Sequence, residues 1–260
     1  MGGGPSAELV LVADEGRVRL LTLNRPEKAN AFDGPLYAAA ATALHTAADD
    51  ESVSAVVVTG AGTSFSAGVD ITAMTARDAD GSDGLGATFA DFVGIVAAFP
   101  KPLLGAVNGA AVGIGFTMLL HFDVVVLSDR ARLRAPFTRM GVAPEAASSF
   151  LLPRRMGRQP AAIAFFTSDW IEPQDAVDHG LALRVCAPER LVPETLATAA
   201  HIAEQPLPSL VATKRLLLDA EREGIARAIA LENDAFAELL ALPNATARVT
   251  AQLDKAGRGA

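Results

Sequence analysis

The feature that most constrains the fold of this chain is the alternation of short apolar runs with helical stretches. Residues 54–59 (SAVVVT) form a β-branched run that suits a buried parallel strand. Runs at 103–107, 123–127 and 181–185 are also predicted strands, and they are separated by predicted helices at 85–99, 145–156, 159–166 and 173–179. Strand–helix alternation of this kind predicts an α/β fold with a largely parallel sheet.

The two ends of the chain depart from this alternation. Residues 8–13 and 17–23 predict a hairpin around Asp14-Glu15-Gly16, and Asp33 and Pro35 predict the start of a helix that runs to Asp50. From Pro188 onward only helical segments are expected, with apolar periodicity that must be buried on the core or on a neighbouring subunit. We therefore divide the chain into a disordered leader (1–7), a core (8–200) and a C-terminal helical region (201–260).

Composition excludes several classes of function. The 260-residue chain has a net charge of −8 and a pI near 5.0, which argues against a nucleic-acid partner because phosphates demand a basic face. Cys186 is the single cysteine, and the four histidines are far apart, so no metal site is expected. No apolar stretch approaches the length of a membrane span, and no signal peptide is apparent. A cytoplasmic, bacterial protein is the expectation.

Several familiar catalytic motifs are also missing. The sequence contains no G-x-S-x-G elbow and no Walker A motif, and Met118 stands where a dinucleotide-binding motif needs its third glycine. Two glycine-containing segments remain, 64–70 (SFSAGVD) and 108–115 (NGAAVGIG), each between a strand and a helical stretch. Each can present free backbone N–H groups, and two such groups converging on one point would form an oxyanion hole. Taken singly, each segment is better explained as a tight strand-to-helix turn.

Taken together, these segments resemble those of a known family. The loop 23–31 (LNRPEKANA) resembles the CoA-binding loop of the crotonase (enoyl-CoA hydratase/isomerase) family. Residues 65–71 resemble its first oxyanion segment and residues 102–115 its second, so the resemblance covers about residues 8 to 243. It implies a spiral of repeated ββα units, C-terminal helices that mediate trimerisation, and a homotrimer or dimer of trimers. It also implies an acyl-CoA thioester substrate and no separate cofactor.

The resemblance assigns roles to particular residues. Val69 and Ile114 take the places of the two oxyanion donors, which act through their backbone N–H groups. Asp70 is expected to fix its loop rather than to react. The positions that fall where the family contacts CoA or substrate are Lys28, Ala29, Ala31, Ser66, Ala67, Gly68, Asp70, Ile71 and Gly113.

The sequence departs from a hydratase at the two acidic positions that activate water. Thr117 and Phe137 stand where a hydratase of the family has glutamates, and neither side chain is a general acid or base at neutral pH. The next carboxylate is Glu145, in a segment (GVAPEAASS) that resembles the peroxisomal-type Δ3,Δ2-enoyl-CoA isomerases, where the glutamate after this proline is the base. The acyl pocket is expected to contain Phe116, Thr117, Phe137 and Phe150.

These residues predict a Δ3,Δ2-enoyl-CoA isomerase in which Glu145 carries a proton from C2 to C4 beside an oxyanion hole. Three alternatives stay open: hydration by a different set of residues, thioester hydrolysis, and a non-catalytic acyl-CoA-binding protein. A glutamate in the first turn of a helix also has a purely structural explanation, since the helix dipole favours it.

Overall fold

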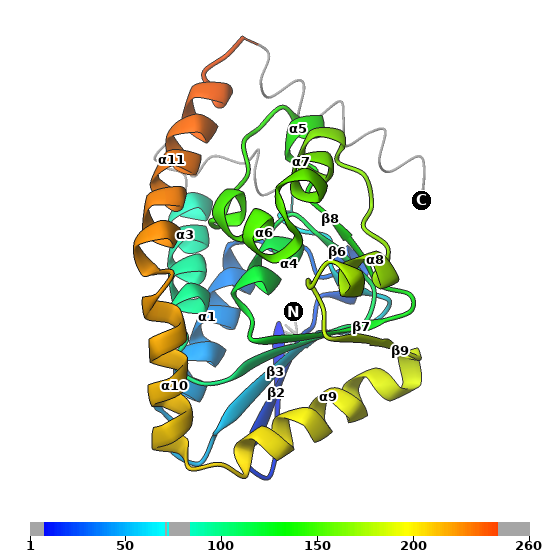
Figure 1. Ribbon diagram of the computed structural model, residues 1–260, viewed down its shortest axis with the longest axis vertical. Coiled ribbons are helices and arrows are strands. Elements are labelled where there is room, and N and C mark those ends of the chain that lie inside the picture. Colours follow the sequence, from blue (N-terminus) through cyan, green and yellow to red (C-terminus); the bar gives the residue numbers. More distant parts are fainter. Residues whose placement is uncertain (1–7, 71, 73–83, 244–260) are drawn as a thin grey trace, which may run out of the picture.

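A computed structural model describes residues 8–70, 72 and 84–243, and its framework is a six-stranded, largely parallel sheet (Figure 1). The strands lie in the order β1-β2-β3-β5-β7-β9, and only β1 and β2 pair antiparallel. Gly16, with φ of +59°, turns this hairpin as predicted. Their bounds are β1 (Val10–Glu15), β2 (Val18–Leu23), β3 (Ala55–Gly60), β5 (Leu103–Val107), β7 (Val124–Ser128) and β9 (Arg184–Cys186).

A second sheet of three short strands lies beside the first. Its strands are β4 (Ser64–Ser66), β6 (Ala110–Val112) and β8 (Arg132–Arg134), all parallel and in that order. Each follows a strand of the large sheet and precedes a helix, which confirms the predicted spiral of ββα units. The sequence analysis assigned no strand to the glycine segments 64–70 and 108–115, which contain β4 and β6, and it missed β8 as well. Three residues are too few for side-chain alternation to show in a sequence.

The helices fall close to their predicted positions, with one instructive exception. Asp33 caps α1 by accepting a hydrogen bond from the N–H of Leu36 at 2.9 Å. The helix predicted over 145–156 begins instead at Ser148, because Ala146 and Ala147 have φ of +54° and +57°. The helices are η1 (Pro26–Lys28), α1 (Gly34–Asp49), α3 (Gly84–Ala97), α4 (Ile114–Thr117), η2 (Met118–His121), α5 (Phe137–Met140), α6 (Ser148–Met156), α7 (Arg158–Thr167), α8 (Pro173–Asp178), α9 (Pro188–Ala203), α10 (Leu207–Asp219) and α11 (Arg222–Leu240).

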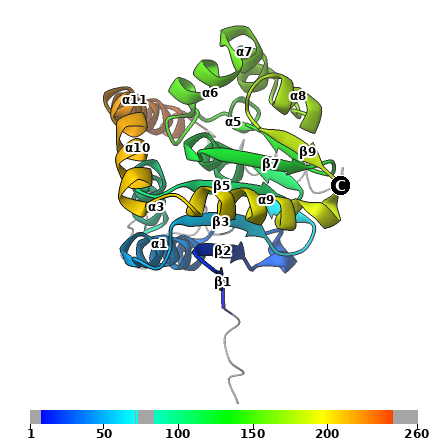
Figure 2. The same cartoon turned by 60° about the horizontal axis from the view of Figure 1, so that its bottom comes forward.

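Alternate side chains along the strands of the large sheet belong to two separate hydrophobic clusters. Val57, Leu104 and Val126 pack with Leu191 and other side chains of α9, which crosses one face of the sheet (Figure 2). The neighbouring residues of these strands face the main core, where α1 and α3 pack. Because successive side chains of a strand point to opposite faces, burial on both sides explains the nearly continuous apolar runs.

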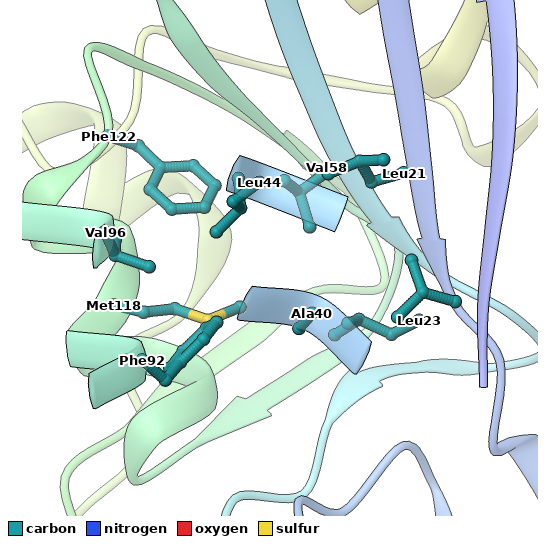
Figure 3. A pocket seen from close by; sticks show the side chains of 10 residues that line it. Leu21, Leu23, Ala40, Leu44, Val58, Phe92, Val96, Met118 and Phe122 are labelled. Atoms are coloured by element: carbon teal, nitrogen blue, oxygen red, sulfur yellow. The ribbon is translucent and has the colours of Figure 1, made fainter. Parts of the chain in front are cut away.

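A small internal cavity of about 20 Å³ lies in the main core between α1, α3 and the sheet (Figure 3). Every side chain that lines it is apolar, so it is expected to be dry. It is a packing defect of the core rather than a binding site. Its lining residues are Val10, Leu21, Leu23, Ala40, Leu44, Val58, Phe92, Val96, Met118 and Phe122.

Candidate active site

Two glycine loops meet where the strands β4 and β6 end. These strands pair in parallel, so the loops that leave them lie at one edge of the small sheet. Gly68 has φ of +92°, and a Cβ there would lie 2.7 Å from the carbonyl oxygen of Val112 and 3.7 Å from Cα of Gly113. Only glycine allows both this backbone conformation and so close an approach.

The residue after Gly68 in the first loop and the residue after Gly113 in the second each carry a backbone N–H for which the described residues offer no acceptor. Within the residues that the structure describes, the N–H groups of Val69 and Ile114 donate to nothing, whereas the N–H of Asp70 donates to the carbonyl of Phe32 at 2.7 Å. Ile114 is completely buried, and a buried N–H without a partner is rare. Because α4 has only four residues, the donors available to the predicted oxyanion hole are these backbone N–H groups rather than a helix dipole.

The predicted CoA loop is attached to the first glycine loop through Asn30. This buried side chain accepts a hydrogen bond from the N–H of Arg25 and donates to the carbonyls of Ala61 and Ser64, at 2.8–2.9 Å. The hydroxyl of Ser66 donates to the carbonyl of Asn30 at 2.8 Å. The N–H of Ala67 likewise donates to the Ala29 carbonyl, at 2.9 Å. Ser66 and Ala67 therefore support the loop, and Asn30 is a positioning residue that the sequence analysis missed.

Asp70 fixes the same loop, as expected. Its carboxylate accepts hydrogen bonds from Arg25, at 2.8 Å, and from the N–H and hydroxyl of Thr72, at 3.0 and 2.6 Å. Burial raises the pKa of Asp70, but these hydrogen bonds outweigh it and hold the pKa below its usual value. Arg25 also donates to the carbonyl of Ala31, which is buried, while Lys28 at the tip of the loop is exposed. Contacts of Lys28, Ala29 and Ala31 with CoA remain predictions.

Glu145 lies between α5 and α6 rather than in the first turn of a helix, so the helix-dipole explanation does not hold. The hydroxyl of Thr117 donates a hydrogen bond to its Oε1 at 3.2 Å. Burial raises the pKa of Glu145 to about 8, Thr117 opposes this shift, and the negative charge of Glu232 adds to it. Glu145 is only partly buried. A partly accessible carboxyl with such a pKa is suited to take up and return a proton near neutral pH.

Tyr37 is a second polar residue near Glu145, and the sequence analysis missed it. Its side chain is completely buried beside Phe32 and Phe92, and its hydroxyl has no hydrogen-bond partner among the described residues. Burial raises its pKa well above 10, and the charge of Glu145 raises it further. The single tyrosine of the chain, on the apolar face of a predicted helix, was the available signal.

The predicted acyl-pocket residues are placed differently from one another. Thr117 contacts Glu145 directly, and Phe116 beside it is buried. Phe137 is buried against Phe165 of α7, with ring centroids 6.4 Å apart. Phe150 packs against Gly224 of α11, and the Arg154 guanidinium lies over its ring. Contact of these rings with an acyl chain remains a prediction, and Ile71 lies outside the described residues.

Other kinds of site find no support in the described part of the chain. No three His, Cys, Asp or Glu side chains gather there as a metal site would require. Among the same residues, no helix is both long and apolar enough to cross a membrane.

A spiral of ββα units with unpaired N–H groups at two touching glycine loops defines a class, the crotonase-type acyl-CoA enzymes. Comparison with known proteins agrees: the family model described as "Enoyl-CoA hydratase/isomerase" matches residues 13–251. The chain belongs to the enoyl-CoA hydratase/isomerase family.

Relatives within this family carry the names of both reactions. Enoyl-CoA delta isomerase 2 of Rattus norvegicus is 34% identical over 225 residues, which are 85% of this chain and 57% of that protein. A probable enoyl-CoA hydratase of Rhizobium meliloti is 34% identical over 91% of each chain. The crystal structure of an enoyl-CoA hydratase/isomerase from Pseudoalteromonas atlantica superposes with a TM-score of 0.88 at 36% identity, covering 95% of this chain and 97% of that one. The chain thus spans little more than half of the rat relative, and the names leave the reaction open.

Proposed function

We propose that the protein is a Δ3,Δ2-enoyl-CoA isomerase in which Glu145 is the single acid–base residue. The observation that carries the proposal is the pairing of Thr117 with Glu145: the position of a hydratase glutamate holds a hydroxyl that donates to the one carboxylate. The isomerase named among the relatives is consistent with it. The reaction requires no cofactor beyond the CoA of the substrate.

The mechanism follows from these groups. The thioester carbonyl oxygen accepts hydrogen bonds from the N–H groups of Val69 and Ile114, which stabilises negative charge on that oxygen. The Glu145 carboxylate takes a proton from C2 to give a dienolate, and the resulting carboxylic acid returns the proton to C4. The double bond moves from C3–C4 to C2–C3, and both the enzyme and the atom count of the substrate are unchanged.

Hydration makes a different demand on the site. Water must be both activated and split across the double bond, and the family uses two glutamates for this. Thr117 and Phe137 carry no carboxylate at those positions, which leaves Glu145 as the acid–base residue of the proposal and favours proton transfer within the substrate over addition of water. Apolar neighbours such as Phe116 favour the same outcome if they exclude water.

A direct assay separates the two reactions. The protein is incubated with a 3-enoyl-CoA, and formation of the conjugated thioester is followed by its ultraviolet absorbance; in parallel, loss of that absorbance from a 2-enoyl-CoA measures hydration. Isomerisation is expected to be the faster reaction by far. Efficient hydration with little isomerisation would contradict the proposal, and binding without either reaction would favour a non-catalytic acyl-CoA-binding protein.

The pKa of Glu145 predicts how isomerisation depends on pH. The base must be ionised to accept the C2 proton, and its pKa is about 8. Below this pH, kcat/KM is expected to rise about tenfold per pH unit, and above it to level off. Steady-state kinetics from pH 6 to 10 check this. A profile that is flat between pH 6 and 8 would show that the essential base is another group.

We also propose that the C-terminal helices join subunits into a trimer or a dimer of trimers. Leu216 and Leu217 of α10 are 69% and 64% exposed, and Leu231 of α11 is 58% exposed. Ile225 of α11, in contrast, is buried on the core. The apolar periodicity of the tail therefore serves two surfaces, of which the exposed one suits a second copy of the chain. Analytical ultracentrifugation is expected to give a mass of three or six chains, and a monomer would contradict this.

A further inference from the structure

A buried carboxylate on α11 accepts hydrogen bonds from the backbone shortly after Glu145. Glu232 of α11 is buried, and its Oε2 and Oε1 accept hydrogen bonds from the N–H groups of Ala147 and Ser149, at 2.7 and 2.8 Å. These donors lie at the start of α6, where Ala147 has no side chain that could cap the helix. Glu232 therefore supplies the N-terminal cap of α6 from a helix 85 residues further along the chain.

The backbone that Glu232 binds is strained, and His121 contacts the same turn through a carbonyl oxygen. Ala146 and Ala147 both adopt the left-handed conformation, which non-glycine residues keep only where their surroundings enforce it. The Ala146 carbonyl oxygen lies 2.8 Å from Nε2 of His121. Burial lowers the pKa of His121 to about 4, so the ring is neutral, and Nε2 must carry its proton because a carbonyl only accepts. The turn after Glu145 is thus fixed by His121 through a carbonyl and by Glu232 through two N–H groups.

We propose that Glu232 is a positioning residue, which holds the Glu145 carboxylate at the site through the backbone of residues 146–149. Its catalytic consequence rests on the isomerase function proposed above. A second effect comes from charge. Among the described residues, the charge of Glu232 acts on Glu145, Thr117 is its hydrogen-bond donor, and the charge of Glu145 in turn acts on Tyr37. The negative charge of Glu232 makes Glu145 a stronger base, so removing it is expected to lower the pKa of Glu145.

Glu232→Gln is the variant that tests this role. The amide keeps the shape of the side chain but can accept only one of the two N–H bonds, and it has no charge. Glu238→Gln is the matched control, because Glu238 lies on the same helix and is exposed. The readouts are kcat and KM with a 3-enoyl-CoA, thermal unfolding, and the titration of Glu145 by NMR of protein with ¹³C-labelled glutamate carboxyls, assigned with Glu145→Gln.

Glu232→Gln is expected to lower kcat about 10- to 100-fold with little change in KM, as misplacement of a catalytic group does. The Glu145 titration is expected to move to lower pH, while Glu238→Gln behaves as the wild type in both measurements. A folded Glu232→Gln protein with lower thermal stability but unchanged kcat and Glu145 titration would overturn the proposal and leave Glu232 as a helix cap only.

A second variant and the NMR titration test the role of Glu232 where the first variant or the assay fails. If Glu232→Gln does not fold, Glu232→Asp retains the charge but cannot reach both N–H groups without moving the turn, so kcat is expected to fall at least about tenfold. An unchanged kcat in that variant overturns the proposal. The NMR titration does not depend on any reaction. A wild type that fails to isomerise 3-enoyl-CoA therefore contradicts the proposed function, whereas the titration still decides whether Glu232 acts on Glu145.

Discussion

Replacing Glu145 with glutamine is expected to lower kcat for isomerisation by roughly 10²- to 10⁴-fold while acyl-CoA binding is retained, because general acid–base catalysis contributes about this much. Glutamine has nearly the same shape and can still accept the hydrogen bond from Thr117, but it cannot carry the proton from C2 to C4. Measurement of kcat together with calorimetric binding of a saturated acyl-CoA checks both halves of this expectation. Isomerisation at the wild-type rate would show that Glu145 is not the base.

The stability of the same variant provides its control. The pKa of Glu145 rises from 4.5, its ordinary value, to about 8 in the folded protein. Glu145 ionises at a lower pH in the unfolded chain than in the folded protein. Its contribution to the free energy of unfolding therefore falls progressively as pH increases from about 4.5 through 8. At pH 9 Glu145→Gln is expected to have a free energy of unfolding about 1–3 kcal/mol above that of the wild type, with little difference at pH 4. Urea unfolding at both pH values measures this, and a loss of stability at pH 9 would instead indicate damage to the fold.

Gly68→Ala is expected to have the second-largest effect, a fall in kcat/KM of about 10²- to 10³-fold. The new methyl group would meet the Val112 carbonyl oxygen at 2.7 Å, and the φ of +92° is strained for alanine. Both effects push the two glycine loops apart and disturb the N–H groups of Val69 and Ile114. Loss of one oxyanion donor costs about this much in other enzymes.

Gly94→Ala is the matched control for that substitution. Gly94 lies inside α3 and is exposed, and apart from its chain neighbours and the backbone of its own helix, no described atom lies within 4 Å of where its Cβ would be. Alanine there is expected to raise stability by about 0.5–1 kcal/mol and to leave kcat/KM unchanged. Equal activities of the Gly68 and Gly94 variants would contradict the oxyanion-hole interpretation of residues 68–69 and 113–114.

Sequence reasoning was sufficient for the parts of the fold that are regular and long. The β-branched run 54–59, the hairpin at Gly16 and the Asp33 cap were each predicted, because local composition and turn chemistry determine them. The family also followed from three ordered motifs, whereas Glu145 as the catalytic base stays a prediction. The small sheet did not, since β4, β6 and β8 have three residues each and depend on pairing between segments far apart in the chain.

The buried polar groups around Glu145 could not be predicted for a related reason. His121, Tyr37 and Glu232 come from three distant segments, and none belongs to a motif near residue 145. One signal was present: Glu232 interrupts the apolar face of a helix that includes Ile225, Ile229 and Phe236. An acid on a buried face needs a partner, but the sequence does not indicate that this partner is the backbone of Ala147 and Ser149.

The distance along the chain between α11 and the turn that it holds has a consequence for biosynthesis. Glu232 follows Ala147 by 85 residues, so the ribosome releases the turn after Glu145 well before the side chain that binds it. Under the role proposed for Glu232, a nascent or truncated chain that lacks α11 keeps only the His121 contact to hold a strained turn with two left-handed alanines. Catalytic competence is thereby tied to completion of the polypeptide, and fragments that retain every motif of the spiral are expected to be inactive.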